Sequence, residues 1–204
     1  MMRSVRLACA VLALSLVPTA VLAQAGTTPF LTLPVTLEKG QSDMGGYVSI
    51  EDDIDLFGVY RRGLAPNFDG ALRGGFTAAG DGGVNLGADF RFLIAGASQD
   101  LPLNFALVTN AQFSFTGNFF LFAVPFGVSM GAEIQAGEGR PLWLYGIPYG
   151  VFAYVNPDGP GDSATDWDIG AELGGQLFLS GRLWLTAALT VQNDVAFAIG
   201  LNYR

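Results

Sequence analysis

The stretch WDIGAELGGQLFL, residues 167–179, decides the fold class of this chain. Every second residue from Trp167 to Leu179 is apolar or glycine, and the positions between them carry Asp168, Glu172, Gln176, two glycines and one phenylalanine. Successive side chains of a β-strand point to opposite faces, so a period of two predicts a strand with two different faces. The stretch therefore predicts a strand whose two sides meet different surroundings.

The same period runs through the chain from about residue 43. Alternation broken by turn residues predicts ten strands, at about 43–50, 54–62, 68–77, 83–94, 103–116, 119–134, 142–155, 167–179, 182–191 and 195–203. After Ala23 no stretch has a helical period or 18 consecutive apolar residues. We expect an all-β fold, a closed antiparallel up-and-down transmembrane β-barrel over 43–204 with about ten strands. Eight or twelve strands are alternatives, because the first two are less clearly separated, and 24–42 form a lead-in of unassigned structure.

The two faces of the last eight segments differ in composition. The apolar phase has 50 positions, none charged and only Thr109 polar, whereas the opposite phase has 42 positions, of which 17 are Gly, Ala or Pro and seven are charged. The interior of a barrel of this size cannot hold 50 mostly large side chains. A basic residue on the lipid face at the bilayer midplane costs ~2–4 kcal/mol. We therefore expect the apolar phase to face lipid and the small and charged phase to face the lumen.

A sheet in lipid must close on itself, because an open edge would leave backbone groups unpaired. If both termini lie in the periplasm, strand direction alternates and the aromatic residues fall at two heights. Such rings of aromatics mark the two interfaces of a membrane barrel. The predicted aromatic girdle comprises Tyr60, Phe68, Phe92, Phe105, Trp143, Tyr145 and Tyr203 near the periplasmic rim and Trp167 toward the outer rim.

The first 23 residues have the pattern of a secretory signal peptide. Arg3 and Arg6 precede an apolar run over 7–16, and a small-residue site ends at Ala23. We expect cleavage after Ala23 and export. Cys9 would be removed with the signal, so the mature chain would lack cysteine.

Composition excludes several function classes. The chain has 10 basic and 18 acidic residues, and two of the basic ones lie in the signal, which leaves 8 against 18 and a net charge of −10. This charge argues against a nucleic-acid partner. The chain has no histidine, so together with the missing cysteine it lacks the usual zinc and copper ligands, and we expect neither a metal nor a cofactor.

Charged residues on the expected lumen face form two groups. Segments 68–77 and 83–94 predict a hairpin in which either Arg73 lies opposite Asp89 or Asp69 lies opposite Arg91, the other pair then being diagonal. With Arg61 from the preceding strand, this predicts a lumen ion cluster of Arg61, Asp69, Arg73, Asp89 and Arg91. The cluster is either a structural filling of the lumen or a gate or selectivity element.

The second group comprises the lumen carboxylates Glu133, Asp168 and Glu172. Two of them could form an acid/base pair. The simpler interpretation is that they are lumen charges that are solvated or ion-paired.

Among the charged residues of the expected outer loops, all are acidic. These acids either form a solvated surface or bind divalent cations that bridge to lipopolysaccharide phosphates. These loop acids are Glu51, Asp52, Asp53, Asp81, Asp158, Asp162, Asp166 and Asp194.

Two prolines, Pro125 and Pro148, lie inside predicted strands. Each lacks the backbone N–H that would donate a hydrogen bond to the neighbouring strand, so we expect β-bulges near them.

The stretch VAFAIGLNY, residues 195–203, resembles the terminal strand of the small outer-membrane β-barrel proteins of Gram-negative bacteria. Residues 60–69 resemble a strand–turn–strand element of uncharacterised members, and the likeness extends over roughly 43–204. It implies a location in the cell outer membrane. It also implies contact with the lipid bilayer and lipopolysaccharide, and with the barrel-assembly machinery during biogenesis. This chain departs from the pattern by one residue, Arg204, after the closing aromatic.

Enzymes among such barrels rely on a catalytic histidine, which this chain lacks. We therefore expect a non-enzymatic protein with no catalytic residue. The favoured function is an integral outer-membrane β-barrel with a largely filled lumen and a structural or surface role. A narrow passive, porin-like channel for ions or small hydrophobic molecules is the alternative.

Overall fold

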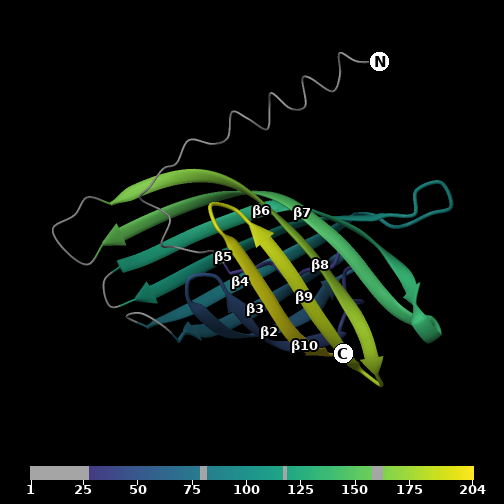
Figure 1. The fold of residues 1–204 in the computed structure, drawn as a ribbon. Helices are drawn as coiled ribbons and strands as arrows, with labels where there is room; N and C mark the ends of the chain where they lie inside the picture. The colour runs from purple at the N-terminus through teal and green to yellow at the C-terminus, as the bar shows by residue number, and fades with distance from the viewer. Residues whose placement is uncertain (1–27, 79–81, 117–118, 158–162) are drawn as a thin grey trace, which may run out of the picture.

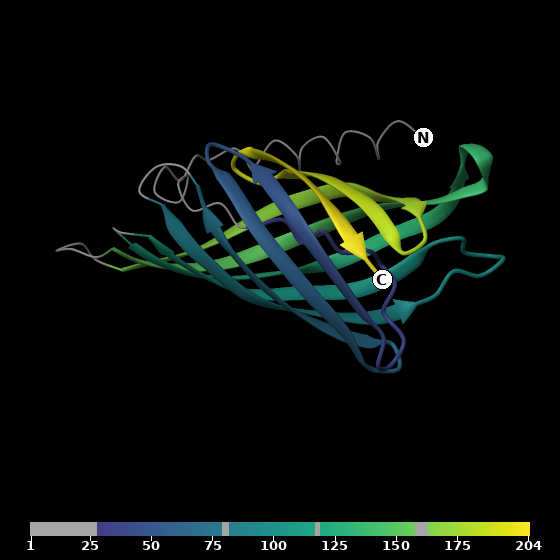
Figure 2. The same cartoon turned by 90° about the horizontal axis from the view of Figure 1, so that it is seen from below.

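The computed structural model describes residues 28–78, 82–116, 119–157 and 163–204, and the predicted signal peptide and the loop acids Asp81, Asp158 and Asp162 lie outside these ranges. Within them the chain forms a closed antiparallel barrel in which each strand pairs with its neighbours in sequence and β1 pairs with β10 (Figures 1 and 2). The strands are β1 Ser42–Ile50, β2 Ile54–Ala65, β3 Phe68–Thr77, β4 Gly83–Ala95, β5 Asn104–Thr116, β6 Phe119–Ala136, β7 Arg140–Pro157, β8 Ala164–Ser180, β9 Leu183–Val191 and β10 Val195–Tyr203. The predicted fold class and its count of ten strands are confirmed.

The two ends of the barrel differ. We call the end where β1 begins and β10 finishes the terminal rim, and the other end the distal rim. Two connections at the terminal rim are tight turns that contain residues in left-handed conformation, Asn67 with φ 60° and Gly181 with φ 57°. The β6–β7 hairpin closes through a single 3₁₀ turn, Gly137–Gly139, which extends beyond the neighbouring strands (green in Figure 2).

The outside of the wall is apolar. Leu72, Trp167, Ile169 and Leu173 are each about two-thirds exposed, and many other large apolar side chains of the outer face are half exposed. A soluble domain buries such residues, whereas a barrel in lipid presents them. The apolar phase counted in the sequence points outward on β3, β4, β5, β6, β8, β9 and β10, as predicted.

On β7 the expected phase is wrong. Trp143, Tyr145, Ile147, Tyr149 and Val151 point into the barrel, where all five are buried. The outward positions in the middle of β7 carry Gly146, Pro148 and Gly150, between the larger outward residues Leu144 and Phe152. Neither phase of this strand bears a charge over residues 142–155, so the alternation could not show which one faces lipid.

The bulges expected at Pro125 and Pro148 are also absent from the described ladders. The β5–β6 register stays constant across a gap opposite Pro125, between the pairs Thr109–Phe126 and Gln112–Ala123. The β6–β7 register likewise continues across a gap opposite Pro148. Each proline therefore interrupts the ladder hydrogen bonds without inserting a residue, and the Thr109 hydroxyl donates to the Pro125 carbonyl at 3.1 Å.

The described part of the chain contains no helix that is both long and apolar enough to cross a membrane.

Part of the lead-in lies inside the barrel. Residues 28–34 are buried, and 28–37 belong to no strand or helix. Phe30 and Leu33 pack in an apolar cluster with the inward side chains of β7, and Leu31 packs in a second cluster with Tyr47 and Phe57. The lumen is therefore occupied by a segment of the chain itself and not by wall side chains alone.

Candidate functional site

The candidate site is the lumen together with the segment that occupies it, Thr28–Leu37, which we call the lumen segment. It is joined to β1 by the turn Glu38–Gln41 at the terminal rim. Gly40 donates to the Gly63 carbonyl at 2.9 Å, and Gly63 donates to the Gln41 carbonyl at 2.9 Å. A Cβ at Gly63 would lie 2.0 Å from the Glu38 carbonyl oxygen, so glycine permits this close approach.

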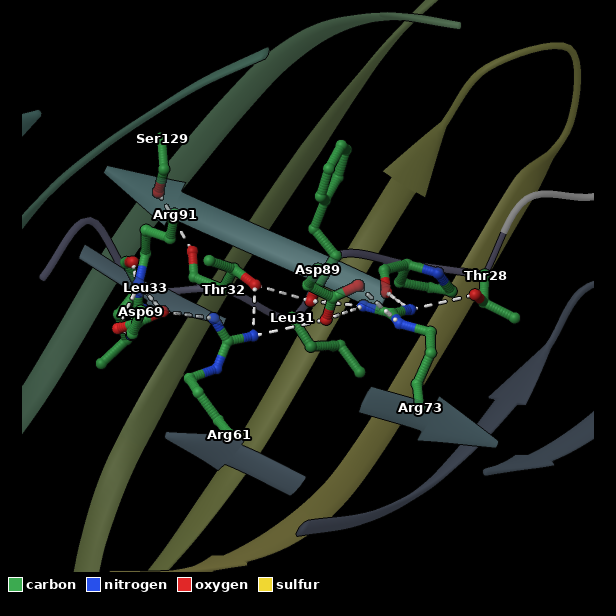
Figure 3. A network of polar contacts seen from close by, with 12 residues as sticks. Thr28, Leu31, Thr32, Leu33, Arg61, Asp69, Arg73, Asp89, Arg91 and Ser129 are labelled. Carbon is green, nitrogen blue, oxygen red and sulfur yellow. Dashed lines mark hydrogen bonds and ion pairs between the residues drawn. The ribbon is translucent and has the colours of Figure 1, made fainter. Parts of the chain in front are cut away.

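The five residues of the predicted ion cluster lie together on β2, β3 and β4, all buried (Figure 3). Asp69 accepts from Arg61 at 3.1 Å and also forms an ion pair with Arg91. Asp89 accepts from Arg73 at 2.8 Å and from Arg61 at 3.5 Å. Arg61 therefore links the two carboxylates into one network.

The strand register explains this arrangement. Asp69 lies directly opposite Arg91, while Arg73 lies opposite Gly87 and reaches Asp89 diagonally. A Cβ at Gly87 would stand 2.9 Å from Cγ of Arg73, so the missing side chain gives the arginine its path across the strand. Of the two registers open from the sequence, the chain adopts the one that pairs Asp69 with Arg91.

The cluster also holds the lumen segment. Arg73 donates to the carbonyl oxygens of Pro29 at 2.8 Å and Phe30 at 3.2 Å, and to the Thr28 hydroxyl at 3.0 Å. Arg91 donates to the Leu33 carbonyl at 2.6 Å. Figure 3 shows the segment lying between these arginines. The same guanidinium groups that neutralise the aspartates thus bind the main chain of the segment.

Glu172 on β8 binds the segment from the opposite wall. Its carboxylate accepts the backbone N–H groups of Phe30 at 2.7 Å and Leu31 at 2.9 Å, and the Tyr145 hydroxyl at 3.0 Å. Leu31 has φ 52°, a left-handed conformation that is uncommon for a leucine. Successive N–H groups around a left-handed residue form a small anion-binding concavity, and here a fully buried carboxylate fills it.

Neutral side chains complete the contacts. The Gln112 amide on β5 donates to the Thr28 carbonyl at 3.0 Å and accepts from the Thr28 N–H at 3.1 Å. Ser129 on β6 donates to the Thr32 carbonyl at 3.0 Å. The Phe30 ring meets Tyr149 edge-on, with ring centroids 5.3 Å apart. Every strand from β2 to β8 thus contributes to the site.

The three predicted lumen carboxylates do not come together. Glu172 lies in the site, whereas Glu133 is exposed on β6 near the terminal rim, and Asp168 accepts from Gln192 and Asn193 toward the distal rim. Asp168 and Glu172 are four residues apart on one strand face, which separates them by roughly 13 Å. This arrangement does not form the acid/base pair that the sequence left open.

The predicted aromatic girdle needs one correction. Tyr60, Phe92, Trp167 and Tyr203 are exposed on the outside, and Phe68 and Phe105 are half-buried there. Trp143 and Tyr145 are instead lumen residues, because their strand turns its large side chains toward Phe30 and Leu33. Sequence reasoning therefore missed Tyr145 as a site residue, along with Gln112 and Ser129.

Arg204, which follows the terminal aromatic, has a local role. It forms an ion pair with Asp43 at 2.8 Å, donates to Gln176 at 2.7 Å and stacks its guanidinium 4.8 Å from the centroid of the Trp184 ring. These contacts join β10 to β1, β8 and β9 at the terminal rim. In the described ranges, no group of three or more acidic, histidine or cysteine side chains is arranged to hold a metal ion.

Acids crowd the distal rim, where the turn after β1 lies beside the turn before β10. Burial raises the pKa of Glu51 above its ordinary value, and the nearby carboxylates of Asp194 and Asp52 raise it further. A carboxyl whose pKa is raised in the folded state destabilises the fold while ionised, and this penalty disappears once the pH falls below the pKa of the unfolded chain, near 4.3.

We expect Glu51→Gln to raise the free energy of unfolding at pH 7.5, with the gain declining to nothing as the pH falls toward 4. Urea titration of the refolded protein at several pH values measures this, with Glu38→Gln at the terminal rim as the matched control. A gain that is equal at pH 7.5 and pH 4 would show that charge repulsion at the rim is not its cause.

Comparisons with known proteins found matches among solved structures alone. No protein-family model matches the chain, and no curated protein is similar to it. Among solved structures, the N-terminal β-barrel domain of Pseudomonas aeruginosa OprF is 10% identical, with 82% of this chain and 98% of that chain covered and a TM-score of 0.38. KdgM porin is 7% identical, with 79% of this chain and 98% of that chain covered and a TM-score of 0.43. Ail of Yersinia pestis is 14% identical, with 81% of this chain and 98% of that chain covered and a TM-score of 0.32.

The chain resembles outer-membrane β-barrel proteins. At these identities and TM-scores the likeness carries no conclusion about this chain. It transfers no residue role and no ligand.

Proposed function

We propose that this protein is an integral outer-membrane β-barrel, exported by a cleaved signal peptide, whose lumen is closed by its own N-terminal segment and whose role is structural or at the cell surface. The observation that carries the proposal is the lumen segment, which is bound by arginines on one wall and by Glu172 on the other. The exposed apolar side chains on the outside of the wall, which we call the apolar belt, support the proposal that the wall faces lipid.

The barrel would contact lipid and lipopolysaccharide through this belt. The strand β10 ends in the aromatic residue Tyr203, which the barrel-assembly machinery would read. A catalytic role has no support from the arrangement of the lumen carboxylates.

We expect the refolded full-length protein to produce no discrete conductance steps in a planar bilayer, because the lumen segment fills the path that ions would take. A variant with Arg73→Ala and Glu172→Ala together should conduct, because it releases the segment from both walls. The absence of conductance steps in the wild type is interpreted only where heat-modifiable gel migration shows that the barrel has folded. Steps of one reproducible size in the wild type would contradict the closed barrel.

A second candidate function, binding of a small hydrophobic molecule, is favoured by a groove on the outside of the wall. The groove has a volume of about 830 Å³ and lies over β3 to β8. Its sides include Phe90, Leu107 and Phe126, and its floor includes Pro148 and Gly150. It exists because the middle of β7 turns Ile147 and Tyr149 inward and leaves Gly146, Pro148 and Gly150 outside.

A photoreactive diazirine fatty acid in lipid nanodiscs tests the groove. We expect crosslinks to concentrate on β4 to β8 and to fall at least severalfold in Gly150→Leu. The three atoms nearest to a Cβ at Gly150 all belong to the Phe126 ring, the first at 3.1 Å, so the substitution meets a side chain before it meets backbone. Equal labelling around the whole apolar belt would show that the groove binds nothing specific.

A further inference from the structure

We propose that the lumen is a binding site for an uncharged polypeptide segment, that Thr28–Leu37 is its resident ligand, and that a peptide supplied from outside the chain can replace it. The proposal deepens the closed barrel described above and rests on the lumen segment's position. It adds a ligand class, an uncharged peptide, and a property that a permanent filling of the lumen would not have, which is exchange.

The wall recognises the main chain of the segment more than its side chains. Among the described residues, wall side chains make nine hydrogen bonds to backbone groups of the segment. They make two to its side chains, the hydroxyls of Thr28 and Thr32. Every polypeptide carries the same backbone groups, so these hydrogen bonds suit a peptide as a class, while the apolar clusters around Phe30, Leu31 and Leu33 favour apolar side chains at those positions.

Charge in the site is complementary to an uncharged ligand. The segment TPFLTLPVTL, residues 28–37, contains no charged residue. The charged wall residues that bind it or neutralise one another are three arginines and three acids, namely Arg61, Arg73, Arg91, Asp69, Asp89 and Glu172. Their charges sum to zero, so a neutral segment leaves no buried charge unbalanced, whereas an acidic or basic one would.

The barrel does not depend on the segment for its backbone hydrogen bonds. The ladder closes from β1 through β10 without it. The lumen segment forms no strand and is held by side chains, so its departure would break no pair of the sheet. Its covalent link to the wall is the exposed turn Glu38–Gln41. A ligand held in this way can leave while the wall stays intact.

The sequence itself supplies the experiment. Lys39 is the single lysine of the chain and is exposed in that turn. An endoproteinase specific for lysine would therefore cut the native full-length protein once, between the lumen segment and β1. Lys39→Arg preserves the charge and prevents the cut, which makes it the matched control. Should the turn resist the protease, a variant with four glycines inserted after Lys39 supplies the cut.

The cut protein is then incubated with an N-acetylated, isotope-labelled synthetic peptide of residues 28–39 and examined by native mass spectrometry. We expect one labelled peptide per barrel, in exchange for one resident segment, and no incorporation into uncut Lys39→Arg. A peptide N-methylated at Phe30 and Leu31 loses both donors to Glu172 and should bind at least tenfold more weakly. A peptide N-methylated at Lys39 should bind like the unmodified one.

Two outcomes would overturn the inference. If the cut is complete and the labelled peptide never enters, the segment is a permanent filling and not a ligand. If the peptide methylated at Phe30 and Leu31 binds as well as the unmodified peptide, the wall does not recognise the main chain through Glu172. Conductance by the uncut protein would instead refute the closed barrel, so the failures of the two proposals are distinguishable.

Discussion

Asp69→Ala is expected to lower the free energy of unfolding by about 3–5 kcal/mol, the usual cost of removing one partner from a buried ion pair. Asp69 is fully buried and accepts from Arg61, Arg91 and the Leu37 N–H. The substitution would leave the buried Arg91 without its carboxylate and free one end of the lumen segment. Urea titration of the refolded barrel in lipid vesicles, followed by tryptophan fluorescence, measures the change.

Asp100→Ala is the matched control, because Asp100 is exposed in the β4–β5 connection at the terminal rim. A surface change of this kind should stay within about 0.5 kcal/mol of the wild type. Equal urea midpoints for wild type and Asp69→Ala would mean that the cluster contributes nothing to the stability of the barrel.

Glu172→Ala should cost about 3 kcal/mol or more, since each buried donor left without an acceptor costs about 1–3 kcal/mol. The substitution removes the acceptor of the Phe30 and Leu31 N–H groups and of the Tyr145 hydroxyl. The same urea titration measures the loss. Hydrogen exchange then locates it, because the amides of Phe30 and Leu31 should lose their protection while the strand amides keep theirs.

Glu133→Ala is the control for this change, since Glu133 is a glutamate of the same barrel with an exposed side chain. It should alter neither the urea midpoint nor the exchange at Phe30. If Glu172→Ala left the exchange of Phe30 and Leu31 slow, the carboxylate would not be what holds the segment.

The strands and their closure could be predicted because each depends on local alternation. In residues 167–179 and 195–203 one phase is apolar throughout and the other carries the polar and small residues, so the faces are distinct before any tertiary contact is known. Lipid requires the sheet to close, whatever its side chains do.

The orientation of β7 could not be predicted from alternation, because neither of its two phases bears a charge over residues 142–155. Its inward phase, which includes Trp143 and Tyr149, is as apolar as a lipid-facing one. Those side chains point inward because the lumen holds an apolar segment with Phe30 and Leu33. A face that packs against protein and a face that packs against lipid have the same composition, and only knowledge of the occupant separates them.

The lumen segment was missed because it has no periodicity to detect. Residues 28–37 form neither strand nor helix, and their main chain is bound by side chains from strands far along the sequence, such as Glu172 and Gln112. One signal was present. The stretch between Ala23 and the first strand is long, uncharged over 28–37 and rich in apolar residues, which is unusual for an exposed linker.

The most direct test of the central claim, that residues 28–37 lie in the lumen, is a cysteine crosslink in Thr32→Cys/Ser129→Cys. The Ser129 hydroxyl lies 3.0 Å from the Thr32 carbonyl oxygen, and Cys9→Ser removes the one native cysteine from the precursor. Thr32→Cys/Met130→Cys is the control, because Met130 belongs to the outward phase of the same strand.

After treatment of the folded protein in membranes with a short bis-maleimide, the unfolded chain is cut at Lys39. We expect the N-terminal fragment to stay attached in the Ser129 pair and to be released in the Met130 pair. Release in both pairs, with both cysteines shown to be alkylated, would contradict it.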